Sequence, residues 1–270
     1  MIHVIILTFN ESLHIRRAVQ SALEITSSVF VIDSFSTDDT VQIACGLGAT
    51  VYKRAWKNHS DQFNWGLEKV GAQAGDWIFR LDADEYLSNP LIQKINSIDF
   101  RSSLYKGFSV NRRIVFQGDE VKYGGVGSTY IVRFFEYGFG RSETKLMDEH
   151  IVINGKVGTL RERLYDNNLN DLEYWFSKHL RYAKNEAIDY ISTDSFTPNI
   201  GFSAKVRRFM KSWIYYSFPT GLRPFVFYFY RMFIRMGVFD TVGGKSFHFF
   251  QCLVYRRMVD SEISKRKQEC

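Results

Sequence analysis

The chain of 270 residues has little cysteine and no long uncharged apolar run. Its three cysteines, Cys45, Cys252 and Cys270, are odd in number and far apart. That pattern argues against a disulfide framework and fits a reducing compartment. No run of about 20 residues is free of charge, so we expect no membrane-spanning helix. The start, Met1–Leu7, lacks a basic region and a small-residue cleavage site, so we expect no signal peptide.

Positive charge and aromatic residues concentrate at one end of the chain. The whole chain has a formal net charge of +6. Residues 1–200 carry 22 Lys and Arg against 25 Asp and Glu, whereas residues 201–270 carry 13 against 4. The same last 70 residues hold 17 of the 44 aromatic side chains. This asymmetry indicates an anionic partner for the carboxyl-terminal end only.

Apolar runs alternate with helical patterns in the first 100 residues. The runs predict strands at residues 2–8, 29–33, 49–53 and 77–81. We expect Asn10 and Thr37 to cap the helices that follow the first two strands, and Pro90 to open a later helix. Strands that alternate with helices form βαβ units, which predicts a largely parallel sheet.

The pattern changes after residue 104. Segments 108–116 and 129–135 are strand-like and lie on either side of the glycine-rich turn 124–127, so we expect mixed or antiparallel strands there. Residues 170–192 have a helical pattern. We therefore predict the α/β fold class, with a Rossmann-like, mostly parallel central sheet, helices on both of its faces, and a helical amphipathic region at the carboxyl end.

Two carboxylates one residue apart, Asp82 and Asp84, follow the predicted strand 77–81 directly. In open α/β sheets, ligands bind beyond the carboxyl ends of the strands. A hard divalent cation is often held by one or two carboxylates together with substrate phosphates. The pair therefore predicts a site for Mg²⁺ or Mn²⁺ facing a diphosphate. A plain acidic turn is the alternative interpretation.

Polar side chains also follow the first two predicted strands. They are Thr8, Asn10 and Glu11 after the first strand, and Asp33, Ser34, Ser36, Thr37 and Asp38 after the second. Since the carboxyl ends of parallel strands share one edge, we expect them to converge with Asp82. The Asp33 carboxylate can accept a hydrogen bond from the imide N–H of a uracil, or it simply forms a turn. The hydroxyls of Ser36 and Thr37 can approach a phosphate at a helix N-terminus, or cap that helix.

The order of these motifs resembles the family 2 glycosyltransferases of the GT-A fold. The motifs are Thr8-Phe9-Asn10-Glu11, Asp33-Ser34-Phe35-Ser36-Thr37-Asp38 and Asp82-Ala83-Asp84-Glu85, supported by Gln62-Phe63-Asn64-Trp65 and by the run from Trp77 to Leu87. The resemblance covers residues 1–160 well and is closest to the bacterial branch that builds lipopolysaccharide core, O-antigen and capsule glycans.

The resemblance implies inverting transfer of a sugar from a nucleotide diphosphate, with a UDP-hexose as the favoured donor. It implies that Asp84, together with Asp82, binds Mg²⁺ or Mn²⁺. The implied contacts to the nucleotide sugar are Thr8, Asn10, Glu11, Asp33, Ser34, Ser36, Asn64 and Asp82.

Inversion by direct displacement needs a base that takes the proton of the acceptor hydroxyl. We favour Glu149 as this base, with Asp148 a close alternative, although an exposed acidic turn would have the same sequence. The departing diphosphate needs positive charge. His150 is a candidate contact for a phosphate, or else supports a residue that makes such a contact. Lys178, His179 and Arg181 are candidate contacts for the diphosphate, or else belong to a solvated face.

The last 70 residues interleave cations with bulky apolar side chains. The cations that fall at helical spacing are Lys205, Arg208 and Lys211 in one set, and Arg223, Arg231 and Arg235 in another. A basic amphipathic helix rich in aromatic residues lies in the headgroup plane of an anionic membrane. A core helix and a homo-oligomer interface are the alternatives. Nucleic-acid binding is disfavoured because no nucleic-acid motif is recognisable.

We predict a catalytic domain at residues 1–200 and a membrane-associating tail at residues 201–270. Within the first, residues 1–100 form the nucleotide-binding half and residues 101–200 the acceptor half. The expected enzyme is a metal-dependent hexosyltransferase, peripheral on the cytoplasmic face of a bacterial inner membrane. Its expected acceptor is a glycan linked to polyprenyl diphosphate or to lipid A–core.

Two other functions stay open as alternatives. A sugar nucleotidyltransferase would also use carboxylate-bound Mg²⁺, but it usually has a glycine-rich basic loop after the first strand, which this chain lacks. A non-catalytic, membrane-bound assembly partner would keep a degenerate glycosyltransferase domain. Intact Asp33, Asp82 and Asp84 argue against that second alternative.

Overall fold

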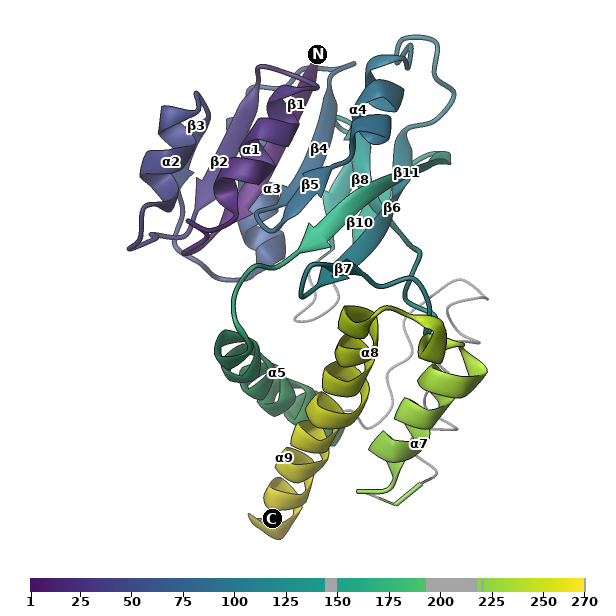
Figure 1. Cartoon of the computed structure of the whole chain (residues 1–270). Helices are drawn as coiled ribbons and strands as arrows, with labels where there is room; N and C mark the ends of the chain where they lie inside the picture. Colours follow the sequence, from purple (N-terminus) through teal and green to yellow (C-terminus); the bar gives the residue numbers. More distant parts are fainter. Residues whose placement is uncertain (144–149, 193–217, 220, 270) are drawn as a thin grey trace. The chain divides into compact units, whose positions relative to one another are not determined.

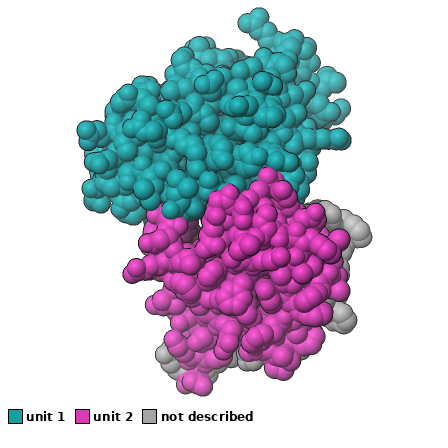
Figure 2. Space-filling model, viewed as in Figure 1, with its two compact units in different colours: residues 1–115, 128–169 teal, residues 116–127, 170–270 magenta. Residues whose placement is uncertain are grey.

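The protein is described from a computed structural model, in which residues 1–143, 150–192, 218–219 and 221–269 are placed (Figure 1). The chain divides into two compact units, coloured separately in Figure 2. Unit 1 comprises Met1–Val115 and Ser128–Leu169, and unit 2 comprises Phe116–Gly127 and Asn170–Cys270.

The first half of unit 1 alternates strands and helices. In chain order these are β1 (Ile2–Thr8), α1 (Ile15–Leu23), β2 (Val29–Asp33), α2 (Thr40–Gly46), β3 (Thr50–Lys53), α3 (His59–Lys69), β4 (Trp77–Asp82), β5 (Glu85–Leu87) and α4 (Asn89–Asn96). The second half supplies β6 (Gly107–Phe116), β8 (Thr129–Glu136), β9 (Gly140–Ser142), β10 (Ile151–Ile153) and β11 (Val157–Asn167).

The central sheet has the strand order β3-β2-β1-β4-β8-β6-β11-β5. Strands β1 to β4 are mutually parallel, β8 runs antiparallel to both β4 and β6, and β11 is parallel to β6. A separate antiparallel pair joins β9 to β10. The predicted α/β fold class with a mostly parallel sheet and carboxyl-terminal helices is confirmed, and it is consistent with a GT-A fold.

Alternate side chains of β1 enter two different hydrophobic cores. Val4 and Ile6 pack with α1, α2 and α4 on one face, whereas Ile5 and Leu7 pack with α3 on the other. Successive strand residues point to opposite faces, so a strand covered on both sides must be apolar throughout. This explains why the first strand is an unbroken apolar run rather than an alternating one.

The predicted caps Asn10 and Thr37 are wrong, because α1 begins at Ile15 and α2 at Thr40. Asn10 adopts a left-handed conformation with φ of 54°, and its side-chain oxygen accepts from the backbone N–H of Thr37 at 2.8 Å. The two loops that follow β1 and β2 therefore hydrogen-bond to each other instead of starting the helices.

Unit 2 combines one short strand with several helices. They are β7 (Asp119–Glu120), α5 (Leu172–Ser192), α7 (Arg223–Phe229), the π-helical η1 (Tyr230–Ile234), the 3₁₀ turn η2 (Gly237–Phe239), α8 (Val242–His248), the π-helical η3 (Phe249–Val254) and α9 (Tyr255–Glu269). Helices α5 and α9 share an apolar core that includes Ala183, Ala187 and Val259. Among the described residues, no helix has the length and apolar character needed to cross a membrane.

Asp240 joins the loop of residues 116–127 to the carboxyl-terminal helices of unit 2. Its buried carboxylate accepts from the backbone N–H groups of Lys122 and Tyr123, each at 3.1 Å. Arg231 donates to the carbonyl oxygen of Gly124 at 3.0 Å. The glycine at 124 is required, because a Cβ there would lie 2.0 Å from the ring of His248.

Arg223, Arg231 and Arg235 do not share the outward face that their spacing predicts. Arg223 is buried, and its Nε donates to Asp260 at 2.6 Å, so the predicted basic face is wrong for this residue. Burial lowers the pKa of Arg231, whereas Arg235 is exposed. The other predicted cations, Lys205, Arg208 and Lys211, lie outside the described residues.

We expect Gly66→Ala to destabilise the protein by about 1–3 kcal/mol, because overpacking forces a close-packed interface apart. An added Cβ would lie 2.9 Å from Cγ1 of Ile32, where α3 meets the sheet. Gly46→Ala is the matched control, since nothing lies within 4 Å of its added Cβ. Urea denaturation of both variants checks this. Equal stabilities would contradict the close approach of α3.

Candidate active site

The strand register brings the predicted site residues to one edge of the sheet. Thr8 of β1 pairs with Asp33 of β2, and Leu7 pairs with Asp82 of β4. Because these strands are parallel, all three end at the same edge, where α/β sheets bind ligands. The convergence expected from the sequence is therefore present in the structure.

Asp33 is completely buried and already carries three hydrogen bonds. Thr8 donates through Oγ1 at 3.1 Å, and Ser36 donates through both Oγ and its backbone N–H, at 2.5 and 2.9 Å. An ionised carboxylate has about four lone-pair positions, so one acceptor position is left. These bonds fix the orientation of the Asp33 carboxylate at the strand end.

The hydroxyl of Ser34 has no hydrogen-bond partner within the described part of the chain, although Ser34 is 94% buried, with 6% of its surface exposed. A buried polar atom without a partner costs free energy and needs an explanation, such as a ligand or a water. Ser34 lies directly beside Asp33. This position therefore points to a polar ligand at the end of β2.

Two exposed aromatic residues flank this polar edge and were missed from the sequence. Phe9 and Phe35 are both more than half exposed. Phe35 has a φ of 60°, which is rare for a bulky residue and indicates a conformation imposed by its surroundings. An aromatic residue within a polar loop was the signal available in the sequence.

Glu11 is engaged with a buried histidine. Its Oε2 lies 2.6 Å from Nδ1 of His14, and Nε2 of His14 accepts from the backbone N–H of Leu169 at 2.8 Å. The second bond requires an unprotonated Nε2, so Nδ1 carries the proton and donates to Glu11. Glu11 and the missed residue His14 thus tie the β1 loop to the end of β11.

Asp82, whose side chain is 34% exposed, pairs with two buried arginines. Arg133 of β8 donates to Asp82 at 2.5 Å and to Glu85 at 2.7 Å, and Nε of Arg80 lies 3.5 Å from Asp82. Burial opposes ionisation of Asp82, but Arg133 and Arg80 hold the pKa of Asp82 well below its usual range. Burial raises the pKa of Glu85 to about 7 against the effect of Arg133.

Asp84 is held in the turn between β4 and β5 by residues at the end of β11. Its backbone carbonyl accepts from the N–H of Asn167 at 3.0 Å and from Arg17 at 3.3 Å. Its carboxylate accepts from the side-chain amide of Asn168 at 3.2 Å. Asp84 is half-buried, so a ligand can reach its carboxylate.

The carboxylates of Asp82 and Asp84 fit a cation that takes most of its ligands from water and from substrate phosphates. Among the placed residues, no group of three or more His, Cys, Asp or Glu side chains has the arrangement of a metal site. Asp84 interacts with a neutral amide, whereas the charge of Asp82 is already balanced by two guanidiniums. Mg²⁺ keeps several waters and binds one or two carboxylates plus phosphates, so Asp84 suits it better than Asp82.

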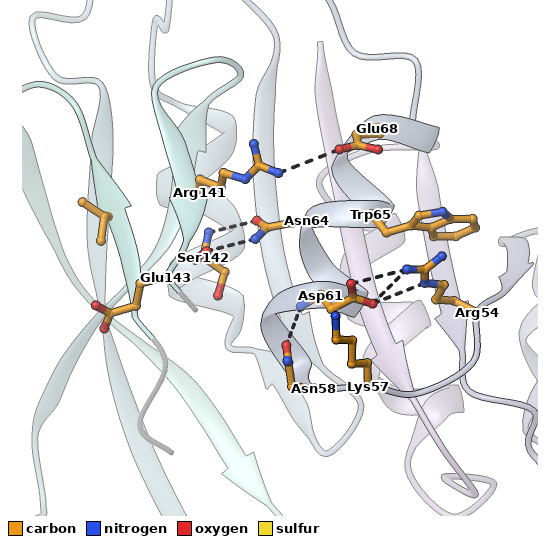
Figure 3. Close-up of a pocket in the computed structure, with 11 residues that line it drawn as sticks. Arg54, Lys57, Asn58, Asp61, Asn64, Trp65, Glu68, Arg141, Ser142 and Glu143 are labelled. Carbon is orange, nitrogen blue, oxygen red and sulfur yellow. Dashed lines mark hydrogen bonds and ion pairs between the residues drawn. The ribbon is translucent and has the colours of Figure 1, made fainter. Parts of the chain in front are cut away.

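Asn64 has a structural role in this unit. Its amide donates to the carbonyl of Ser142 at 2.9 Å and accepts from the Ser142 N–H at 3.1 Å, which ties α3 to β9 (Figure 3). Beside this contact lies an open cavity of about 720 Å³. Its lining residues are Arg54, Lys57, Asn58, Asp61, Asn64, Trp65, Glu68, Arg141, Ser142, Glu143 and Val152.

The remaining predicted site residues lie away in the sequence from the edge formed by β1, β2 and β4. Asp148 and Glu149 lie outside the described residues. His150 is exposed, and its backbone N–H donates to Glu143 at 3.3 Å. Lys178 and Arg181 lie on α5 of unit 2, so their contact with a diphosphate stays a prediction.

The sequence profile of glycosyl transferase family 2 matches residues 3–154, more than half of the chain. The chain therefore belongs to this family and is a glycosyltransferase. An uncharacterized glycosyltransferase of Rickettsia prowazekii is 25% identical over 262 residues, which cover 91% of this chain and 88% of that protein. The lipopolysaccharide core biosynthesis glycosyltransferase LpsC of Rhizobium meliloti is 26% identical over 162 residues, 58% of each chain.

Two solved structures are similar at lower identity. Residues 1–349 of S. aureus TarS are 13% identical with a TM-score of 0.48, and the match covers 100% of this chain and 92% of that one. Glucosyl-3-phosphoglycerate synthase of Mycobacterium tuberculosis is 20% identical with a TM-score of 0.34, over 42% and 44% of the two chains.

We expect Arg133→Ala to destabilise the protein by about 3–5 kcal/mol, because it leaves Asp82 and Glu85 without their shared counter-charge. Arg141→Ala is the matched control. Its ion pair with Glu68 is exposed and 3.8 Å long, so its loss should cost less than about 1 kcal/mol. Chemical denaturation measures both losses. A similar loss in the two variants would contradict the role of Arg133.

Proposed function

We propose that the chain transfers a hexose, with inversion, from a nucleotide diphosphate to a lipid-linked glycan. The observation that carries this proposal is the convergence of Thr8, Asp33 and Asp82 at the carboxyl edge of the parallel strands. Family membership supports sugar transfer over the alternatives of nucleotidyl transfer and of a non-catalytic partner. Intact carboxylates at Asp82 and Asp84 support an active enzyme.

In this proposal the nucleoside binds at the end of β2. The oriented carboxylate of Asp33 accepts the imide N–H of a uracil, which favours UDP as the carrier. The buried hydroxyl of Ser34 gains a polar partner when the ligand binds. The exposed rings of Phe9 and Phe35 are available to stack against the planar base.

The diphosphate lies beyond β4 in this proposal. Asp84 would hold Mg²⁺ or Mn²⁺, which when bound would supply positive charge to stabilise the departing diphosphate. Asp82, which Arg133 and Arg80 keep ionised, accepts hydrogen bonds from hydroxyls of the ribose or the sugar. Arg133 acts as a positioning residue because it touches Asp82 and not the substrate.

The proton of the acceptor hydroxyl goes to Glu149, with Asp148 as the alternative base. Direct displacement at the anomeric carbon forms one C–O bond as the bond to the diphosphate breaks, which inverts the configuration. His150, Lys178 and Arg181 are the proposed further contacts for the leaving group. These roles follow from the family resemblance and from the need for a base.

The acceptor is proposed to be a glycan linked to polyprenyl diphosphate or to lipid A–core. The similarity to LpsC, a glycosyltransferase of lipopolysaccharide core biosynthesis, supports this class of acceptor. Such lipids occupy a membrane, so we propose that the enzyme works at the cytoplasmic face of the bacterial inner membrane. The net positive charge of residues 201–270 supports contact with anionic lipid there.

Asp84→Ala should lower the rate of transfer by roughly 10²-fold or more, since it removes the main ligand of the charge-stabilising cation. It should also abolish the increase in thermal stability that Mn²⁺ adds to UDP binding. Asp99→Ala is the control, because this carboxylate lies in an exposed loop. If Asp84→Ala kept full activity with unchanged dependence on Mn²⁺, this would contradict the proposal that Asp84 binds the metal.

Glu149→Gln should lower kcat by about 10²–10⁴-fold and leave nucleotide-sugar binding unchanged, because a general base acts only in the chemical step. Asp148→Asn is tested beside it, and the larger loss identifies the base. Steady-state kinetics and a thermal-shift titration with UDP-hexoses give the two readouts. If both variants kept wild-type kcat, the base would lie elsewhere.

A further inference from the structure

Unit 2 turns a row of large apolar side chains outward. We call this the apolar ridge, and it consists of Phe225, Phe229, Phe233, Ile234, Met236, Phe239 and Val242. All of these side chains are exposed, with 65% of Ile234, 66% of Phe239 and 79% of Val242 accessible. Soluble proteins rarely expose apolar residues in such a concentration, and where they do, the patch contacts a partner or a membrane.

The first part of the ridge is one face of a helix. Phe225, Phe229 and Phe233 lie four residues apart along α7 and η1, so they share a face. The ring centroids of Phe229 and Phe233 are 4.6 Å apart. Arg223 and Met232 of the same segment are buried, so an arginine lies inside while these three phenylalanines are exposed.

The second part of the ridge is held in place by the backbone of a tight turn. Met236 has a φ of 61°, after which η2 carries Phe239 and α8 begins at Val242. The buried Asp240 between them accepts three backbone N–H bonds, and the side chain of Thr241 caps α8. These bonds fix the turn with its apolar side chains facing outward.

Positive charge surrounds the ridge, without exposed negative charge in the same stretch. Residues 221–259 contain six Lys and Arg and a single carboxylate, Asp240, which is buried. Arg235, Lys245 and Arg257 are exposed, and the guanidinium of Arg257 lies 5.7 Å from the ring centre of Phe225. The surface therefore offers apolar contact together with cations.

We propose that the apolar ridge inserts into the interfacial region of an anionic lipid bilayer, with Arg235, Lys245 and Arg257 contacting lipid phosphates. Bulky apolar and aromatic side chains enter the headgroup–acyl boundary, and neighbouring cations add attraction to anionic lipid. Self-association through the ridge is disfavoured, because it would bring like charges together with no exposed carboxylate of this stretch to pair with them. The proposal rests on the proposed function only in that a lipid-linked acceptor makes membrane contact useful.

The test is co-sedimentation of the full chain with phosphatidylcholine vesicles that either contain or lack phosphatidylglycerol. The wild-type protein should bind the anionic vesicles more strongly, and Phe233→Glu with Ile234→Glu should weaken that binding by at least about tenfold, since one buried large apolar side chain shifts an equilibrium by that much. Val242→Glu, on a different element of the ridge, should also weaken it. Unchanged binding in all these variants would overturn the proposal.

Leu104→Glu is the matched control, because Leu104 is 80% exposed but lies in unit 1. It should bind anionic vesicles as the wild-type protein does. Arg235→Gln with Lys245→Gln should lose the preference for phosphatidylglycerol and keep weak binding to phosphatidylcholine. A wild-type protein that binds neither vesicle, or that forms a dimer which Phe233→Glu dissociates, would contradict insertion and assign the ridge to a protein partner.

Each sample is also titrated with UDP-hexoses and Mn²⁺ in a thermal-shift assay. The ridge variants should keep the wild-type shift, which shows that they are folded and that the nucleotide site is intact. Loss of vesicle binding with a normal shift supports the membrane proposal alone. A wild-type protein that binds vesicles but no nucleotide sugar would contradict the proposed function and leave the membrane proposal standing.

Discussion

The acidic turn beyond β4 depends on one buried guanidinium. Arg133 contacts both Asp82 and Glu85, and its positive charge lowers the cost of ionising each of these neighbouring carboxylates. Arg133 reaches them only because β8 pairs antiparallel with β4. The edge formed by β1, β2 and β4 is therefore completed by β8, a strand that lies outside the first 100 residues.

The sequence predicts the fold class and the sheet edge well, because both follow from local patterns. Apolar runs and turn residues are read within a few positions, and parallel strands bring Thr8, Asp33 and Asp82 together. Some of the contacts at this edge are not local. Arg133 and Leu169 are distant along the chain from the groups they contact, and nothing in the spacing of Asp82 or His14 predicts them. The caps Asn10 and Thr37 fail for the same reason, since the two loops bond to each other.

In unit 2, composition alone does not predict which arginines are exposed. Cations and aromatic residues are interleaved along this part of the sequence. From the sequence one expects the cations to face solvent and the aromatic side chains to be buried. Asp260 supplies a buried counter-charge that turns Arg223 inward, and the phenylalanines of α7 take the outer face. A single carboxylate more than 30 residues away thus holds Arg223 inside. Among the described residues of the tail, Arg223 is therefore not available as surface charge.

The two stretches that build unit 2 are separated in the chain by Ser128–Leu169 of unit 1. During synthesis, the loop of residues 116–127 leaves the ribosome long before Asp240, which accepts its backbone N–H groups. Those donors must stay hydrated until Asp240 has been synthesised, so unit 2 cannot finish folding before then. A nascent chain that had reached only residue 230 would carry this loop without its anchor, so removal of Asp240 would also affect residues more than 100 positions earlier.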